Sequence, residues 1–137
     1  MKKSWIILLV MIILVINLSN VLGEVRINEV MADCSINSKN CEWIEIYSNE
    51  SINLTNWVIQ DNSSTKYNFS IDLLNNYLIL ACNATLFNQT HSININIIDL
   101  RCSNGGWLNN GGDNISLFNN NLELESNFNY AGSNSNK

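Results

Sequence analysis

The sequence contains no proline and a single histidine, and basic residues are scarce among its 137 residues. Without proline, chain reversals must come from the other turn-forming residues, Asn, Gly, Asp and Ser. One histidine excludes a His-rich metal site. Seven Lys and Arg against twelve Asp and Glu leave a net charge of −5, and an acidic surface repels phosphate backbones. We therefore expect no nucleic-acid partner, no metal and no cofactor.

Long apolar runs are also scarce, and the longest lies at the N-terminus. Two lysines precede an apolar run from Trp5 to Ile16, and Val21-Leu22-Gly23 supplies residues that tolerate cleavage after Gly23. This layout is typical of a secretory signal peptide. The run is shorter than the roughly 20 residues of a membrane span, but an extension to Leu22 would let it act as a retained anchor. We predict a signal peptide over residues 1–23 and a secreted or cell-surface protein, with membrane attachment only if this segment is uncleaved.

Four cysteines follow the predicted signal peptide, and an even number in an oxidising compartment indicates two disulfides. Three connectivities are possible for Cys34, Cys41, Cys82 and Cys102. We favour Cys34–Cys41, because it would clip the loop between the first two expected strands, and Cys82–Cys102 then remains. The alternative is a four-cysteine zinc site, which usually carries closer cysteine pairs than these.

Short segments rich in Ile, Val, Tyr, Phe and Trp alternate with segments rich in Asn, Ser and Gly, which is the pattern of strands and turns. No segment of helical length shows a 3.6-residue apolar period, although Leu86–Gln89 could form one helical turn. The spacing predicts an all-β sandwich or barrel of about eight short strands. The expected strands are Val25–Met31, Trp43–Ser48, Trp57–Asp61, Thr65–Phe69, Tyr77–Cys82, Ile93–Leu100, Asn114–Phe118 and Leu122–Tyr130.

Alternation along a strand predicts which side chains enter the core. The apolar pairs expected to point inward are Ile44 with Ile46, Leu78 with Leu80, and Ile115 with Leu117. Trp43, Glu45 and Tyr47 then share the opposite face of their strand, so Trp43 is expected to be an exposed aromatic contact. By the same alternation, Asn114 is expected on the solvent side.

Five segments in a fixed order resemble the lamin-tail domain family. They are Ile27-Asn-Glu-Val30, Glu42-Trp-Ile-Glu-Ile-Tyr47, Leu54-Thr-Asn-Trp57 through Asp61, Leu108-Asn-Asn-Gly-Gly-Asp-Asn-Ile-Ser-Leu117 and Leu122–Tyr130. The resemblance covers about residues 25–130 and implies an immunoglobulin-like β-sandwich with Trp57 in its core. We therefore expect the domain to span residues 24–131, and the polar composition of residues 132–137 predicts a C-terminal tail. It implies a binding or scaffolding unit, not a catalyst. Asn56 replaces the family's usual glycine, and Asn tolerates a positive φ.

Candidate chemistry is sparse. Glu29 and Glu45 lie on strands that we expect to be neighbours, and such a carboxylate pair could serve acid–base chemistry or bind a cation. We favour the simpler explanation that these acids are solvated or accept backbone hydrogen bonds at the ends of loops. The loops that begin at Asp61 and Gly111 are rich in oxygen and could hold calcium, but turn chemistry explains them too. His91 is expected in an exposed surface loop.

Asn-x-Ser/Thr sequons, the acceptors of N-linked glycans, are frequent after the predicted signal peptide. Because the chain is rich in asparagine, chance accounts for part of their number. The candidate glycosylation sites are Asn49, Asn53, Asn62, Asn68, Asn83, Asn88 and Asn114.

These observations predict a non-enzymatic binding or structural module of the cell exterior, with a glycan or protein partner. Two alternatives remain open. One is an accessory domain of a secreted hydrolase system, for which Glu29 and Glu45 would be the carboxylate pair. The other is a membrane-anchored surface protein that retains its N-terminal segment.

Overall fold

The computed structural model describes residues 23–33, 40–102 and 106–132. The predicted signal peptide up to residue 22, Cys34 and the tail from residue 133 lie outside these ranges. Within them no helix is long and apolar enough to cross a membrane. The described elements, in chain order, are β1 (Val25–Met31), β2 (Trp43–Ser48), β3 (Ile52–Asn53), β4 (Trp57–Gln60), β5 (Lys66–Phe69), β6 (Asp72–Leu73), β7 (Tyr77–Ala81), α2 (Ala84–Thr90), β8 (Asn96–Asp99), β9 (Gly112–Phe118) and β10 (Leu124–Ala131).

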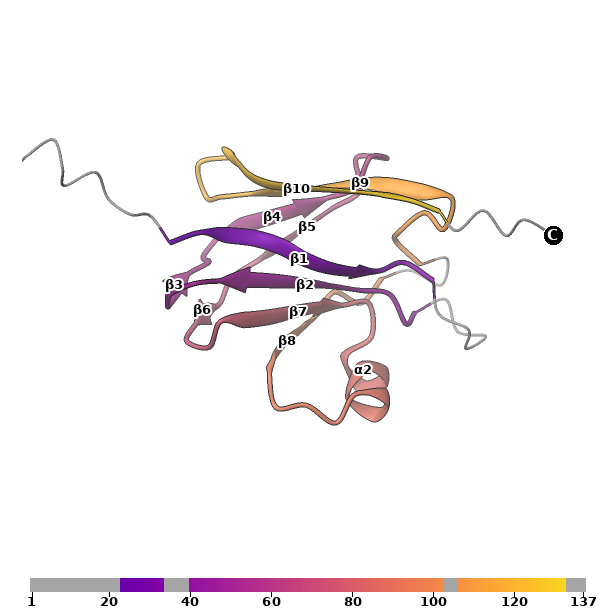
Figure 1. Ribbon diagram of the computed structural model, residues 1–137, viewed down its shortest axis with the longest axis horizontal. Coiled ribbons are helices and arrows are strands. Elements are labelled where there is room, and N and C mark those ends of the chain that lie inside the picture. The colour runs from indigo at the N-terminus through magenta and orange to yellow at the C-terminus, as the bar shows by residue number, and fades with distance from the viewer. Residues whose placement is uncertain (1–22, 34–39, 103–105, 133–137) are drawn as a thin grey trace, which may run out of the picture.

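Two four-stranded sheets form the layers of the sandwich, with strand orders β1-β2-β7-β8 and β10-β9-β4-β5 (Figure 1). The short strands β3 and β6 pair at one end of it. All pairings within the described residues are antiparallel except β7 with β8, which run parallel. A parallel pair needs a crossover connection, and that crossover contains α2. The predicted all-β, immunoglobulin-like sandwich is confirmed.

The core lies between the two sheets and includes all of the inward side chains that alternation predicted. Ile44, Ile46, Leu78, Leu80, Ile115 and Leu117 are all fully buried. Trp57 is only 5% exposed and packs in the same cluster, so its assignment to the core is confirmed. Removing apolar surface of this kind from water is the main source of stability for such a sandwich.

Strand boundaries match the predicted ones within about two residues in most cases, and the exceptions have local causes. The strand predicted from Ile93 begins only at Asn96, because the preceding residues complete the crossover from α2. The helix is longer than the single predicted turn, since the side chain of Asn83 caps it by accepting a hydrogen bond of 2.9 Å from the N–H of Leu86. This is a common helix start. The two-residue strands β3 and β6 were too short to predict.

Several turns use left-handed backbone, and the two at Asn56 and Gly112 are the most informative. Asn56 has φ = 60°, which confirms that it can take the place of the family's glycine before Trp57. Gly112 has φ = 116°, and a Cβ there would lie 3.0 Å from the carbonyl oxygen of Tyr130. Only glycine fits this position without a shift of the neighbouring strand.

Candidate binding surface

The outer face of the β1-β2-β7-β8 sheet carries its side chains in rows that cross the strands. Arg26, Tyr47 and Tyr77 occupy paired positions on β1, β2 and β7, so they form one such row, which we call the Arg26–Tyr47–Tyr77 row. The guanidinium carbon of Arg26 lies 4.6 Å from the centre of the Tyr47 ring. The rings of Tyr47 and Tyr77 are 5.1 Å apart and tilted by 54°.

This row is open to solvent and held in place from one side. Tyr77 is 41% exposed, and the Arg26 side chain is 43% exposed. The carboxylate of Glu24 accepts a hydrogen bond of 2.9 Å from Nη1 of Arg26, so the guanidinium is partly neutralised while it stacks on the tyrosine ring. An arginine over an aromatic face is a favourable cation–π arrangement. The result is a continuous surface of ring faces with polar edges.

Glu29 and Glu45 form the adjacent position along β1 and β2, where their Cα atoms are direct partners. A bulge at Asn28 shifts the register here, and the side-chain amide of Asn28 donates a hydrogen bond of 2.6 Å to Glu45 Oε1. Glu29 is exposed and Glu45 half-buried. The sequence thus placed both acids on neighbouring strands correctly. The exposure of Glu29 and the partial exposure of Glu45 favour hydrogen bonding to a ligand or to water over acid–base chemistry, which usually needs a water-excluding pocket.

Trp43 does not belong to this exposed surface, and the prediction that it is an exposed contact is wrong. It points to the outer face as expected, but it is only 7% exposed. Helix α2 folds over this end of the sheet and packs Phe87 edge-on against the indole, with ring centres 5.6 Å apart. Trp43, Ile79, Ala81 and Phe87 form a second apolar cluster under the helix.

His91 is also placed differently from the prediction. It is half-buried and caps the C-terminus of α2, where its backbone N–H donates to the carbonyl of Phe87. Its ring stacks on Phe87 with centres 4.4 Å apart. His91 is therefore part of the small cluster around α2 and not a residue of an exposed loop.

The two oxygen-rich loops meet, since Asp61 and Asp113 line one hollow of about 220 Å³. Asp61 accepts hydrogen bonds from the N–H of Thr65 and the hydroxyl of Ser63. Asp113 accepts from three backbone N–H groups, those of Asn62, Asn109 and Asn114. Among the described residues no three His, Cys, Asp or Glu side chains gather to hold a metal ion. Turn formation therefore accounts for both loops.

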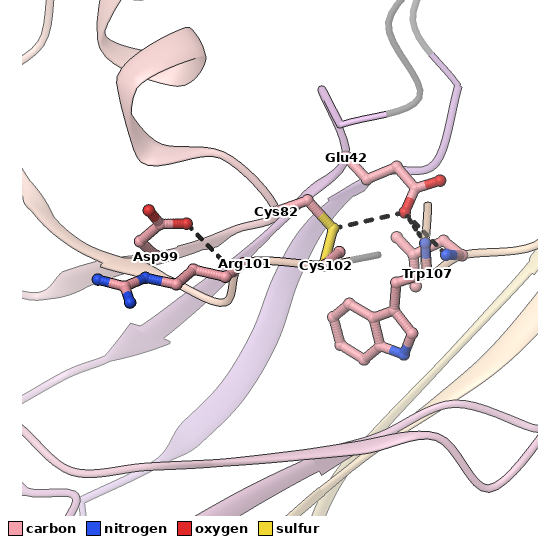
Figure 2. The surroundings of a disulfide bond; sticks show 7 residues. Glu42, Cys82, Asp99, Arg101, Cys102 and Trp107 are labelled. Carbon is pink, nitrogen blue, oxygen red and sulfur yellow. Dashed lines mark hydrogen bonds between the residues drawn. A yellow bond between two sulfur atoms is a disulfide. The ribbon is translucent and has the colours of Figure 1, made fainter. Parts of the chain in front are cut away.

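Glu42 is a buried carboxylate that the sequence pattern did not single out as a site. It is 6% exposed, and its Oε2 accepts hydrogen bonds from the backbone N–H groups of Trp107 and Leu108, the latter at 2.9 Å (Figure 2). Burial raises the pKa of Glu42, and the two backbone hydrogen bonds oppose that rise. Backbone donors leave no signature in a sequence, so residue patterns could not reveal this contact.

The disulfide Cys82–Cys102 lies beside Glu42, with Sγ of Cys82 3.7 Å from Glu42 Oε2 (Figure 2). It joins the end of β7 to the segment after β8. This pairing is the one that the sequence analysis expected. Cys41 is disulfide-bonded as well, while its expected partner Cys34 lies outside the described residues.

The sequons differ in what their side chains do. Asn62, Asn68 and Asn88 are exposed. Asn83 is half-buried and caps α2. Asn114 is half-buried on the outer face of β9, the side that alternation predicted, and its Oδ1 atom is buried without a hydrogen-bond partner in the described part of the chain. The side chains of the remaining two form hydrogen bonds, Asn49 with the N–H of Glu24 and Asn53 with Asp72.

Comparison with known proteins gives one family. The model of the Lamin Tail Domain family matches residues 19–132, which is most of the chain and includes both sheets. A search of the curated proteins found no match.

Proposed function

The chain belongs to the Lamin Tail Domain family, and on this premise we propose that it is an exported, non-enzymatic module that binds a neutral glycan through the Arg26–Tyr47–Tyr77 row. The observation that carries the proposal is the row itself: two adjacent tyrosine rings and a stacked guanidinium on the open part of a rigid sheet. The fold alone names no ligand.

The chemistry of the row fits a sugar. The C–H face of a pyranose ring is apolar and packs on an aromatic face, while tyrosine hydroxyls offer hydrogen bonds at the ring edge. Next to the row, Glu29 and Glu45 supply carboxylate oxygens that can accept hydrogen bonds from sugar hydroxyls. The net charge of −5, and the ion pair that Glu24 makes with Arg26, favour a neutral glycan over an acidic one.

Export is supported by the Cys82–Cys102 disulfide, because such bonds persist mainly in oxidising compartments. The N-terminal segment has the layout of a signal peptide. Activity as a hydrolase is disfavoured by the exposure of Glu29 and of the surface around it. We therefore place the protein at the cell exterior, secreted or surface-held, as a binding or structural module.

The test is co-sedimentation of the disulfide-bonded chain with insoluble neutral polysaccharides, such as cellulose, chitin and mannan, after export in a bacterial host that adds no N-glycans. We expect binding to at least one of them, and about 3- to 10-fold weaker binding by the variants Tyr77→Ala and Tyr47→Ala. The control Leu124→Ala removes an apolar side chain from the other sheet that is even more exposed than Tyr77, at 58% against 41%, and should bind normally. Equal binding by all variants, or none to any polysaccharide, would refute the proposal.

A further inference from the structure

The outer face of the second sheet, β10-β9-β4-β5, also carries a row that crosses its strands, and this one is apolar. Val58 on β4 is paired with Phe118 on β9, which is in turn paired with Leu124 on β10. Neighbouring strands are about 4.8 Å apart, so the three side chains form a continuous strip, which we call the apolar row. Leu122, from the turn between β9 and β10, lies close to it across a hollow of about 860 Å³.

The apolar row is open to solvent at one end. Leu122 is 70% exposed and Leu124 is 58% exposed, and in the described chain α2 packs on the other sheet. Contiguous exposed apolar side chains on a soluble protein usually mark a surface that something covers. The rim of the hollow is mostly uncharged, with Asn56, Gln60 and Asn120 among its residues.

A sequon stands at the opposite end of the same row. Asn68 on β5 is the direct partner of Val58, and Phe69, the middle residue of the sequon Asn68-Phe69-Ser70, points inward and is 4% exposed. Alternation therefore directs the Asn68 side chain to the outer face, where it is exposed and lines the hollow. Of the sequon asparagines, all of which lie in the described residues, Asn68 is the one that lines this hollow. Asn83 caps α2 and Asn88 lies on that helix.

We propose that Asn68 carries an N-linked glycan and that its first sugars lie over the apolar row. The donor is a lipid-linked, phosphate-activated oligosaccharide. Transfer breaks the bond between the anomeric carbon and the donor's phosphate oxygen and forms a bond from that carbon to Nδ2 of Asn68. The amide loses one proton to the medium and the lipid phosphate leaves with the bonding electrons, so no oxidant or reductant is needed.

The position of the row gives the glycan a structural role. From the edge strand β5, a sugar chain directed across the strands passes over Val58, which is only 8% exposed, and then meets the half-buried Phe118 and the exposed Leu124. The apolar surfaces of Phe118 and Leu124 can pack against the C–H faces of the sugars. The glycan then removes apolar surface from water, which stabilises the fold, and it blocks self-association through Leu122 and Leu124. The proposal concerns the sheet opposite to the Arg26–Tyr47–Tyr77 row, and its test does not depend on ligand binding there.

The test begins with the full chain secreted from a eukaryotic host that adds N-glycans. Enzymatic removal of the glycans in ¹⁸O-labelled water converts each occupied Asn to labelled Asp, which peptide mass mapping detects. We expect Asn68 to be occupied. The variant Asn68→Gln from the same host should melt about 2–5 °C lower than the wild type and should self-associate in sedimentation experiments.

Two controls separate the glycan from the substitution. Asn88→Gln removes an exposed sequon on α2, remote from the apolar row, and should change neither melting nor association. Wild type and Asn68→Gln made in a bacterial host that adds no glycans should melt at the same temperature. The proposal is overturned if Asn68 is unoccupied, or if the glycoprotein and Asn68→Gln melt and sediment alike. Equal self-association with and without the glycan would overturn it as well, because a second copy would then cover the apolar row.

Discussion

Replacing Glu42 is the most direct test of how the second half of the chain is held to the first. The Glu42 carboxylate accepts hydrogen bonds from the backbone N–H groups of Trp107 and Leu108, residues more than sixty positions away. The variant Glu42→Ala would leave both donors buried and unpaired, at about 1–3 kcal/mol each. We therefore expect its free energy of unfolding to fall by about 2–6 kcal/mol, a large share of the 5–15 kcal/mol of a typical domain.

The variant Glu42→Gln separates the hydrogen bonds from the charge. Its amide oxygen can accept from the same two N–H groups, but as a neutral acceptor it gives up the extra strength of charge-assisted bonds. The Gln variant also avoids the free-energy cost of burying an ionised carboxylate. This cost is the reason that the pKa of Glu42 is raised. The two effects oppose one another, so we expect a net change within about 1 kcal/mol near neutral pH.

The same pKa shift predicts a pH dependence with a defined sign. The folded state holds the Glu42 proton more tightly than the unfolded state, whose pKa is near the ordinary value of 4.5. The stabilisation that comes from this tighter proton binding is fully present below pH 4.5. It is lost as the pH rises through the higher pKa that Glu42 has in the folded state. The Gln variant cannot titrate, so its stability relative to wild type should improve as the pH rises from about 4 to 8.

Urea unfolding followed by tryptophan fluorescence measures all three proteins, with the disulfide intact and at several pH values. Comparable slopes against urea would show that the same surface unfolds in each. Equal stability of Glu42→Ala and Glu42→Gln would refute the assignment of the carboxylate as a backbone acceptor. A pH-independent difference between wild type and Glu42→Gln would refute the raised pKa.

Three further predictions use the same assay. Trp43→Ala should lower the free energy of unfolding by about 3–5 kcal/mol because the indole is buried under α2, whereas Tyr77→Ala, on the open part of the same outer face, should cost less than about 1 kcal/mol. Equal effects would contradict the division of that face into a part covered by α2 and an open part. Replacing both Cys82 and Cys102 by Ser should lower the free energy of unfolding by about 3 kcal/mol, because the disulfide restricts a loop with a separation of 20 residues in the unfolded chain. An unchanged urea midpoint would mean that the disulfide adds no stability. Glu45→Gln should stay within about 0.5 kcal/mol of wild type, since Asn28 keeps an oxygen acceptor; a larger loss would show that the charge itself matters.

The parts of the fold that were predictable from the sequence depend on contacts between neighbours along the chain. Ile44 with Ile46 and Leu78 with Leu80 alternate with polar or outward residues, and a period of two is enough to identify the strand and its buried face. The turn at Asn56 followed from the family resemblance, because Asn56 stands where the family has a glycine and Asn tolerates a positive φ. Ser64, Arg101 and Leu122 also have positive φ, and no sequence pattern predicted it.

The sequence-based predictions fail where the neighbours of a residue in the folded structure belong to a segment that is distant in the sequence. Alternation correctly placed Trp43 on the outer face of β2, but burial depends on α2, which lies about forty positions later and is too short to show a helical period. Glu42 was missed because its partners are backbone N–H groups, which every residue except proline possesses. The Asn28 bulge likewise fixes which acids become partners across β1 and β2, and a one-residue register shift cannot be read from composition.

A sandwich buries the inner face of each sheet, so any ligand must meet an outer face or a loop, and here the two outer faces have different chemistry. On the first sheet, α2 covers Trp43 and leaves the Arg26–Tyr47–Tyr77 row open, with ring faces and hydrogen-bonding edges that fit a mobile partner. On the second sheet, the strip from the buried Val58 to the exposed Leu124 has few polar groups to orient a partner, but an acceptor for a covalent glycan stands at its edge. Because neither row contributes to the inner core, substitutions on one face should leave the other face and the fold intact. A failure of glycan binding at Tyr77 would therefore say nothing against a glycan at Asn68, and the two proposals can be decided separately.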